Sequence, residues 1–391
     1  SSLMTGRKAF PMKCSKKIAE TVTTAFIISL LAGVGILFYL LPDVSYSETE
    51  KSMLQQAPAF SVSALLDGSY TNEVANYYAD QFPARSLLIE IKALCELSLG
   101  KQENNSVMRG NNGYLIVRDD IPDTEALQNN LETIASFSDT LEIPFTFAVI
   151  GRSTDVMASA LPPLANTARS DLLWDTFGEN TAALNLQPID LMTPLREAAN
   201  AGESVWYRTD HHWTTQGAYL AYRILCDALE LSPMSPDTFT VTCTDNDFRG
   251  TTLAKSGFYW NQSDRIDYYR YAGDLDFVTS DPVTGISFAG FYDLQKLETD
   301  DPYASFLGGN RGRTDVVLPG TAREKLLLIK DSFAHAMVPF LAYHYDLVIL
   351  DLRYYRGSVQ SIIETEKIDR VLFLQYITSL TENAGLGLLN S

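Results

Sequence analysis

The sequence predicts an α/β domain with a mostly parallel sheet, preceded by one membrane-spanning helix. Short β-rich apolar runs alternate with helical patterns between residues 124 and 374, which is typical of a parallel sheet covered on both faces. A single long uncharged run near the N-terminus predicts the membrane helix. With 46% hydrophobic and 20% charged residues in a chain of 391, there is ample material for a buried core.

The charge balance excludes one class of function. Lys and Arg number 30 against 48 Asp and Glu, and the net charge at pH 7 is -18. A surface of this sign repels a phosphate backbone, so we expect no nucleic-acid partner. Positive charge gathers only in residues 1–20, which hold Arg7, Lys8, Lys13, Lys16 and Lys17 against Glu20.

Residues 21–41 are predicted to be a transmembrane anchor. They carry no charged side chain, and a helix of this length, at ~1.5 Å per residue, spans a hydrocarbon layer of roughly 30 Å. The basic flank precedes the run, so the N-terminus is expected in the cytoplasm and the remaining chain outside the cell membrane. The alternatives are a cleavable signal peptide and a buried core helix. The bulky ending Tyr39-Leu40-Leu41-Pro42 and the basic flank favour the anchor.

Composition divides the chain into four expected segments. A basic cytoplasmic tail covers 1–20, the anchor 21–41, a polar and acidic spacer 42–59, and an extracytoplasmic domain 60–391. Within this domain, residues from about 235 to 320 are rich in Gly, Asp, Thr and Tyr and lack a helical period. We expect an irregular or β-rich insertion there.

The secondary structure follows from hydrophobic periodicity and turn residues. Apolar residues spaced three and four apart predict two helices over 60–100, divided by Pro83. Asn112-Gly113 predicts a hairpin, because a type I′ turn needs positive φ at both central positions. The further expected elements are a helix over 124–141, a strand over 145–150, an extended segment over 204–209, a helix over 214–229, a strand over 326–329, a helix over 333–343, a strand over 347–352, a helix over 358–366 and a strand over 370–374.

Two of the four histidines stand together in the segment 207–214, which reads Tyr-Arg-Thr-Asp-His-His-Trp-Thr. In an extended chain residues i and i+2 share a face, so Asp210 and His212 are expected to point into one cleft and His211 away from it. A carboxylate beside an imidazole fixes its tautomer and stabilises its charged form, as a general base requires. A metal site and a hydrogen-bonded core pair are the alternative interpretations.

A serine at the end of an apolar strand is the second candidate. Ser332 follows the strand over 326–329 and opens a helix, so its hydroxyl is expected at the carboxyl edge of the sheet, where ligands bind in open α/β sheets. The backbone N–H of Ser332 could donate to an oxyanion. The alternative is that Asp331 or Ser332 is only a helix N-cap.

Cysteine and histidine spacing gives no metal or cofactor site. Cys14, Cys95, Cys226 and Cys243 form no C-x-x-C pair and no cluster with histidine, so we expect no metal. A Cys226–Cys243 bridge and buried free thiols remain alternatives. The sequence contains no phosphate-cradling Gly-rich loop, and no cofactor is expected.

These features together resemble the bacterial DHHW proteins, which are similar to the AlgX and AlgJ type of polysaccharide O-acetylation proteins. The resemblance rests on residues 207–217, 251–257, the turn Leu307-Gly308-Gly309-Asn310, and residues 330–332, 338–340 and 351–355. It implies an SGNH-hydrolase-like three-layer fold. By the same resemblance Ser332 is the nucleophile, His212 the base and Asp210 its orienter, with Asn310 at the oxyanion and Arg353 and Tyr354 along the acceptor groove. His211 stands where the alginate proteins carry a non-titrating residue.

The expected function is therefore a membrane-anchored serine acyltransferase that O-acetylates a cell-surface or exported polysaccharide. The resemblance implies that a membrane-bound O-acyltransferase supplies the acyl group. The alternatives are a carbohydrate esterase that uses the same triad and a non-catalytic glycan-binding or assembly factor.

Overall fold

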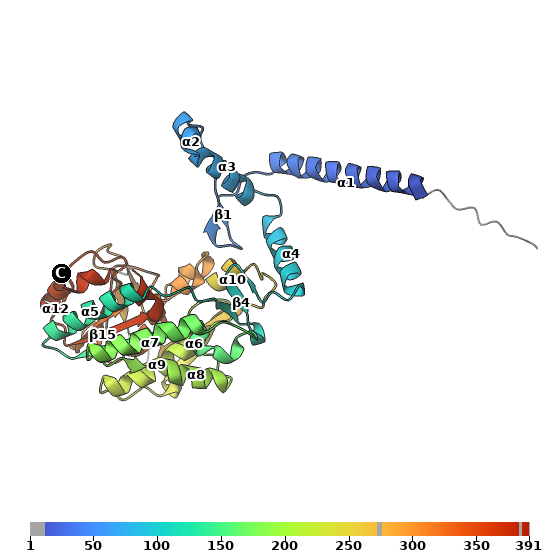
Figure 1. Ribbon diagram of the computed structural model, residues 1–391. Helices are drawn as coiled ribbons and strands as arrows, with labels where there is room; N and C mark the ends of the chain where they lie inside the picture. Colours follow the sequence, from blue (N-terminus) through green and yellow to red (C-terminus); the bar gives the residue numbers. More distant parts are fainter. Residues whose placement is uncertain (1–11, 272–275, 383–384, 391) are drawn as a thin grey trace, which may run out of the picture. The chain divides into compact units, whose positions relative to one another are not determined.

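The computed structural model describes residues 12–271, 276–382 and 385–390, which divide into two compact units at Lys92 and Ala93. The first unit contains the long apolar helix α1, drawn in dark blue in Figure 1. In the described part of the chain, Lys16–Leu40 is the one helix long and apolar enough to cross a membrane. This finding is consistent with a single-pass anchor, and part of the basic tail expected over 1–20 lies outside the described residues.

The rest of the first unit is a short strand pair and small helices. Within it, the Phe38 ring lies 4.9 Å from the Tyr78 ring, and Tyr77 donates to Asp43. The elements are α1 (Met12–Leu40), β1 (Tyr46–Ser47), β2 (Ser52–Met53), α2 (Val62–Asp67), α3 (Ser69–Asp80) and the start of α4 (Arg85–Ser98). Pro83 separates α3 from α4 as expected, but the segment 60–100 holds three helices instead of two.

The second unit is built on an eight-stranded sheet with the order β11-β10-β12-β14-β13-β15-β6-β7. Strands β14, β13, β15, β6 and β7 are parallel, and β12, β10 and β11 add antiparallel to one edge. The bounds are β6 (Phe145–Ile150), β7 (Ile189–Asp190), β10 (Val278–Ser280), β11 (Ser287–Ala289), β12 (Arg313–Val317), β13 (Lys325–Lys330), β14 (Asp346–Leu350) and β15 (Arg370–Tyr376). The mostly parallel sheet expected from the sequence is confirmed.

Helices cover both faces of this sheet and make the fold three-layered. On β13, Leu326 and Leu328 join one core cluster, while Leu327 and Ile329 join the other. The first cluster includes α8 (Met192–Asn200), α9 (Thr215–Ala228) and α11 (Val338–Leu341); the second includes α5 (Thr124–Thr140), α7 (Ala168–Ala183) and α12 (Val359–Glu366). Burial on both faces explains why these strands read as continuous apolar runs.

The insertion expected over 235–320 is β-rich. It contains the hairpin of β8 (Phe239–Phe248) and β9 (Asp264–Tyr271), and α10 (Thr251–Ser256) lies between these strands. Strands β10, β11 and β12 also come from this region. The insertion therefore adds strands to the sheet. It also contains residues 250–251, which contact Asp210.

A smaller sheet confirms the hairpin around Asn112-Gly113. It consists of β3 (Glu103–Asn104), β4 (Val107–Arg109) and β5 (Leu115–Val117). Asn112 and Gly113 have φ of 54° and 77°, as the turn requires. The short helix α6 (Ser153–Val156) follows β6.

The structure differs from the sequence expectation in two further places. The helix expected over 333–343 begins as a 3-10 helix, Ser332–Met337, before α11. The extended segment expected over 204–209 is a loop, in which only Trp206 forms a bridge, with Trp213. The domain start at residue 60 stays a prediction, whereas the second compact unit begins at Ala93.

Truncating a side chain at the centre of the sheet should destabilise the second unit. Leu328 on β13 is 0% exposed, and Leu172 on α7 is 46% exposed. We expect Leu328→Ala to cost about 2–5 kcal/mol of unfolding free energy, because a cavity remains among fixed neighbours. Leu172→Ala, the matched control, should change it by less than about 0.5 kcal/mol. Urea unfolding of both variants measures the difference, and equal losses would contradict the core assignment.

Candidate active site

Two segments far apart in the sequence converge on one hydroxyl group. The loop between Trp206 and Trp213 carries Asp210 and His212, and the Tyr207 N–H donates to the His212 carbonyl at 3.2 Å inside it. Ser332 follows β13 at the carboxyl edge of the sheet, where the sequence placed it. The Trp206–Trp213 bridge and the N-cap of α9 fix where the loop begins and ends.

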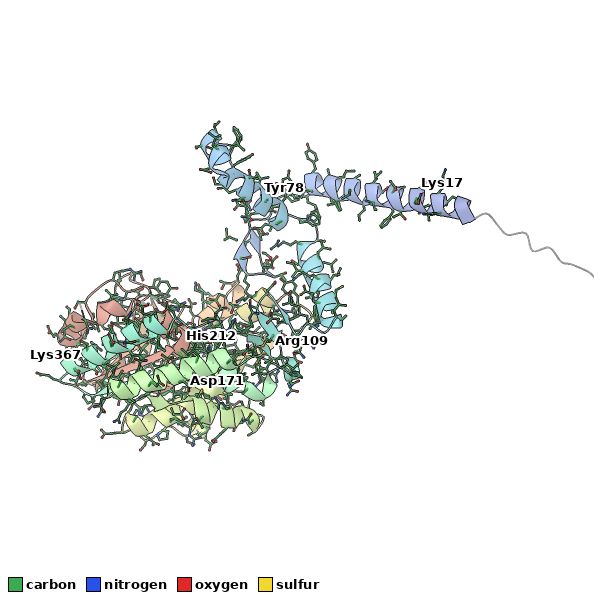
Figure 2. The ribbon with its side chains drawn as sticks, viewed as in Figure 1. Lys17, Tyr78, Arg109, Asp171, His212 and Lys367 are labelled. Carbon is green, nitrogen blue, oxygen red and sulfur yellow. The ribbon has the colours of Figure 1, made fainter. Side chains whose placement is uncertain are left out.

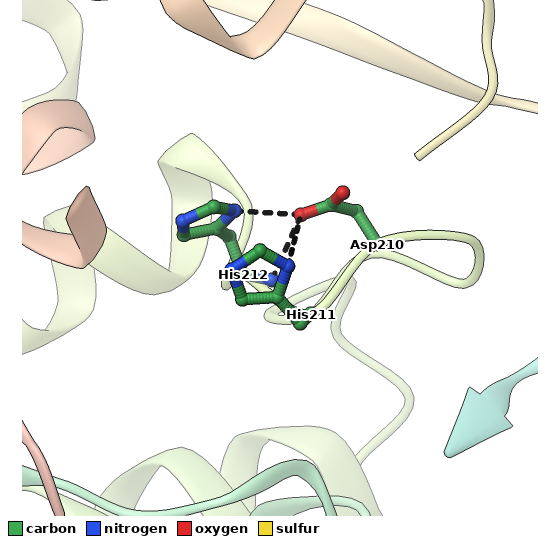
Figure 3. A group of neighbouring side chains, drawn as sticks. All are labelled: Asp210, His211 and His212. Carbon is green, nitrogen blue, oxygen red and sulfur yellow. Dashed lines mark hydrogen bonds and ion pairs between the residues drawn. The ribbon is translucent and has the colours of Figure 1, made fainter. Parts of the chain in front are cut away.

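The three predicted triad residues are within hydrogen-bond distance in series. His212 Nδ1 lies 2.6 Å from Asp210 Oδ1, and His212 Nε2 lies 2.9 Å from Ser332 Oγ. Asp210 and His212 are buried, while Ser332 is half-buried. Figure 2 labels His212 in the second unit, and Figure 3 shows its Nδ1 facing the carboxylate. This geometry lets Asp210 hold a proton on Nδ1 while Nε2 faces the serine as an acceptor.

The Asp210 carboxylate is held by several donors. Its Oδ1 accepts the His212 backbone N–H at 3.1 Å, and its Oδ2 accepts the Thr251 N–H at 2.8 Å and the Thr251 hydroxyl at 3.0 Å. Burial raises the pKa of Asp210, but the neighbouring imidazoles of His211 and His212, the hydrogen bond to the His212 ring and the Thr251 N–H outweigh burial. The net pKa of Asp210 is therefore well below its usual value. The carboxylate is therefore ionised at neutral pH.

Close approach of the turn before α10 makes this arrangement possible. A side chain at Gly250 would place a Cβ 2.3 Å from Asp210 Cβ and 2.7 Å from Asp210 Cα. The φ of Gly250 is -81°, so the glycine is needed for space and not for its backbone conformation. No sequence pattern predicts this contact, apart from the resemblance over residues 251–257.

Aromatic rings fix the orientation of His212. Its ring stacks on Tyr303 with centroids 3.8 Å apart and planes 9° apart, and Phe333 lies at 4.8 Å. Trp213 Nε1 donates to the Phe333 carbonyl at 2.8 Å, which ties the histidine loop to the serine turn. Tyr303 was missed by sequence reasoning, because it lies in a short 3-10 helix of the insertion, Pro302–Ser305, that carries no motif.

Asp331 caps the turn and leaves Ser332 available. Its carboxylate accepts the Phe333 N–H at 3.0 Å, the Tyr376 N–H at 2.6 Å and the Ser379 hydroxyl at 3.0 Å. The alternative that an N-cap occupies this position is therefore correct for Asp331. Ser332 instead contacts His212.

The other expected site residues are not brought against Ser332 by any hydrogen bond in the described chain. Asn310 is exposed. Arg353 binds the Asp351 carboxylate through Nε at 2.9 Å and Nη2 at 2.7 Å, and its guanidinium lies 5.4 Å from the centre of the exposed Tyr354 ring. The buried Lys330 also binds Asp351, at 3.1 Å. The roles given to Asn310, Arg353 and Tyr354 stay predictions.

The prediction that His211 points away from Asp210 and His212 is wrong. Its ring centroid lies 3.8 Å from that of His212, and its Nδ1 is 3.5 Å from Asp210 Oδ1, so it points into the same cluster (Figure 3). The reason is that residues 208–212 form a bent loop, in which the alternation of an extended chain does not apply.

Asp210, His211 and His212 also form the one group of possible metal ligands among the residues that the structure describes. However, the 2.6 Å contact between His212 and Asp210 leaves no room for an ion between them, and His211 Nδ1 is bonded to Thr251 Oγ1 at 2.8 Å. The donor set therefore fits a hydrogen-bonded cluster better than a metal centre.

Family comparisons cover both halves of the site. Residues 107–263 match the family described as SGNH hydrolase-like domain, acetyltransferase AlgX, and residues 190–350 match the DHHW protein family. The chain is 26% identical over 172 residues to a probable alginate O-acetylase AlgJ of Pseudomonas putida, covering 42% of this chain and 44% of the relative. It thus spans less than half the length of that relative.

Two solved structures share the fold. A DHHW family protein from Eubacterium siraeum has a TM-score of 0.62 and 20% identity, covering 74% of this chain and 96% of that chain. Bacillus cereus PatB1 with a sulfonyl adduct has a TM-score of 0.57 and 21% identity, covering 71% of this chain and 97% of that chain. The second unit therefore has the same fold as these two structures, and the family matches over residues 107–263 and 190–350 confirm the resemblance to AlgX-type and DHHW proteins.

Proposed function

We propose that this protein is a serine O-acyltransferase that moves an acyl group, most simply acetyl, onto a hydroxyl of a cell-surface or exported polysaccharide. The observation that carries the proposal is His212, which lies between Asp210 and Ser332 at 2.6 Å and 2.9 Å. The relative named as a probable alginate O-acetylase supports the substrate class. Because that relative is named as an O-acetylase of a polysaccharide, we prefer acyl transfer to a sugar hydroxyl over hydrolysis.

In the first half-reaction Ser332 Oγ attacks the carbonyl carbon of the acyl donor while its proton passes to His212 Nε2. Asp210 keeps the Nδ1 proton in place and stabilises the imidazolium. The backbone N–H of Ser332 is the proposed oxyanion donor, and Asn310 the proposed second donor. The tetrahedral intermediate collapses, His212 returns the proton to the leaving group, and an acyl ester remains on Ser332.

In the second half-reaction a sugar hydroxyl attacks the acyl-Ser332 carbonyl and His212 Nε2 takes its proton. Collapse forms the sugar ester, and the proton returns to Ser332 Oγ, which regenerates the enzyme. Water in place of the sugar gives hydrolysis, the esterase alternative. Arg353 and Tyr354 are the proposed acceptor-side residues.

The location of the reaction is part of the proposal. With α1 as a single-pass anchor and the basic tail in the cytoplasm, the second unit lies outside the cell membrane. Acyl-CoA is not expected there, so a membrane-bound O-acyltransferase partner is proposed to deliver the acyl group. Protease treatment of spheroplasts tests the orientation: digestion of the second unit supports it, and full protection contradicts it.

Replacing the nucleophile should abolish the chemistry. We expect Ser332→Ala to lower turnover of p-nitrophenyl acetate by roughly 10⁴–10⁶-fold and to prevent covalent labelling by a sulfonyl fluoride. The exposed Ser287 on β11 supplies the control, and Ser287→Ala should retain both. Mass spectrometry of the labelled protein locates the adduct. Labelling that survives in Ser332→Ala would favour the non-catalytic glycan-binding alternative.

Removing the charge of Asp210 should separate activity from folding. Asp210→Asn keeps the shape, but the amide can donate to His212 Nδ1 and select the wrong tautomer, so the rate should fall by about 10⁴-fold. Steady-state kinetics with p-nitrophenyl acetate measures the loss, and thermal melts test whether the fold survives. Full activity in this variant would remove the histidine-base mechanism.

Adding a methyl group at Gly250 should lower the reaction rate, but by less than Asp210→Asn does. Gly250→Ala places a methyl group against the Asp210 backbone and shifts the carboxylate without changing its charge. We expect a loss of about 10²-fold, typical of misplacing a catalytic group by an ångström. Gly178 on α7 has open space where its Cβ would lie, and Gly178→Ala is the matched control. An unaffected rate in Gly250→Ala would mean that Asp210 is not required in its present position.

A further inference from the structure

His211 is the member of the histidine cluster that reaches the surface. Its side chain is 40% exposed, against 6% for His212 and 2% for Asp210. The acyl-transfer mechanism above gives it no task. Its position at the mouth of the site therefore needs its own explanation.

The two imidazole rings both turn their Nδ1 atoms toward the Asp210 carboxylate. Both Nδ1 atoms face Asp210 Oδ1, at 2.6 Å for His212 and 3.5 Å for His211, and the ring planes differ by 39°. Consequently both Nε2 atoms lie on the side away from the carboxylate, as Figure 3 shows. The His212 Nε2 contacts Ser332 there. The His211 ring also lies 5.8 Å from that of Phe333, the residue after the nucleophile.

Thr251 selects the tautomer of His211. The Thr251 hydroxyl donates to Asp210 Oδ2 at 3.0 Å, and the same oxygen lies 2.8 Å from His211 Nδ1. Because its one proton goes to the charged carboxylate, the hydroxyl must accept from His211 Nδ1–H. His211 Nε2 is then unprotonated and has no hydrogen-bond partner among the described residues.

His211 is neutral at physiological pH. Partial desolvation and the neighbouring His212 lower the pKa of His211 below its usual value, against the opposing effects of Asp210, Asp331 and Asp301. A neutral ring with an exposed lone pair accepts a hydrogen bond and does not attract an anion. A sugar hydroxyl is a donor of the matching kind.

We propose that His211 recognises a second hydroxyl of the acceptor sugar, adjacent to the one that is acylated. The reacting hydroxyl donates to His212 Nε2, and its neighbour on the next carbon donates to His211 Nε2. Two rings with centroids 3.8 Å apart, whose Nε2 atoms both lie on the side away from the carboxylate, suit two such neighbouring hydroxyls. The acceptor class is therefore a vicinal diol, and His211 is a specificity residue of the transfer half-reaction. The inference rests on the proposed acyltransferase function.

The experiment uses the full chain in detergent with p-nitrophenyl acetate as donor and three alcohols as acceptors: cis-1,2-cyclohexanediol, trans-1,2-cyclohexanediol and cyclohexanol. Nitrophenol release reports acylation, and mass spectrometry of the esters against free acetate reports the partition of the acyl-enzyme. For the wild type we expect one diol to be acylated roughly 2–10-fold more per hydroxyl than cyclohexanol, the range of one net hydrogen bond.

Two variants assign this preference to His211. His211→Phe keeps an aromatic ring but removes the acceptor, and the preferred diol and cyclohexanol should then react equally per hydroxyl. His211→Gln supplies an amide oxygen and should restore part of the diol preference, which a purely structural role would not do. A diol preference that is the same in wild type and His211→Phe, or no preference in wild type, would overturn the inference and leave the acyltransferase intact.

The failure of the underlying function has a different signature. If Ser332-dependent nitrophenol release occurs and no alcohol is ever acylated, the protein is an esterase toward these probes, and the transfer step and the role of His211 are overturned together. If nitrophenol release does not depend on Ser332, the acyl-serine mechanism itself is overturned.

Discussion

The buried Asp210 carboxylate is the group on which the site depends. It is 2% exposed, where an unpaired carboxylate is costly, and its two oxygens are satisfied by the Thr251 N–H and hydroxyl, the His212 N–H and the His212 ring. These donors come from a loop before α9 and from a turn inside the insertion. Satisfying one charge thus fixes the positions of two segments and, through His212, of a third.

A second buried charge organises the other side of the nucleophile. Lys330, the last residue of β13, binds Asp351 and His335 Nε2, at 3.1 Å and 2.7 Å, and Asp351 binds Arg353. Burial lowers the pKa of Lys330, while the Asp351 charge opposes that shift. A buried lysine destabilises the folded state little only while its ionic and hydrogen-bonding partners stay in place. The strand end that presents Ser332 is therefore coupled to the segment that carries Arg353, at the proposed acceptor side of the site.

The sequence was most informative where periodicity is strong. The strand over 145–150, the helices over 124–141 and 214–229 and the parallel strands near the C-terminus lie where their apolar patterns predicted, because both faces of the sheet are buried. Ser332 could be placed from the strand that precedes it. The position of His211 could not be predicted, because side chains do not alternate between two faces in a bent loop. The contacts of Tyr303 and Gly250 could not be predicted either, because they arise from tertiary packing of the insertion and correspond to no periodic sequence pattern.

Under the proposed mechanism the triad alone cannot decide between acyl transfer and hydrolysis. Water and a sugar hydroxyl would both give their proton to His212, and both would attack the same acyl-Ser332 carbonyl. The difference must come from groups that contact the acceptor outside the reacting atoms, since only these gain binding energy from a sugar and not from water. The imidazole of His211 is half-exposed beside the His212 ring, neutral, and oriented by the same carboxylate that orients His212. One buried charge would then serve both tasks, because Asp210 sets the base that activates the attacking hydroxyl and, through Thr251, the acceptor that distinguishes a diol from water.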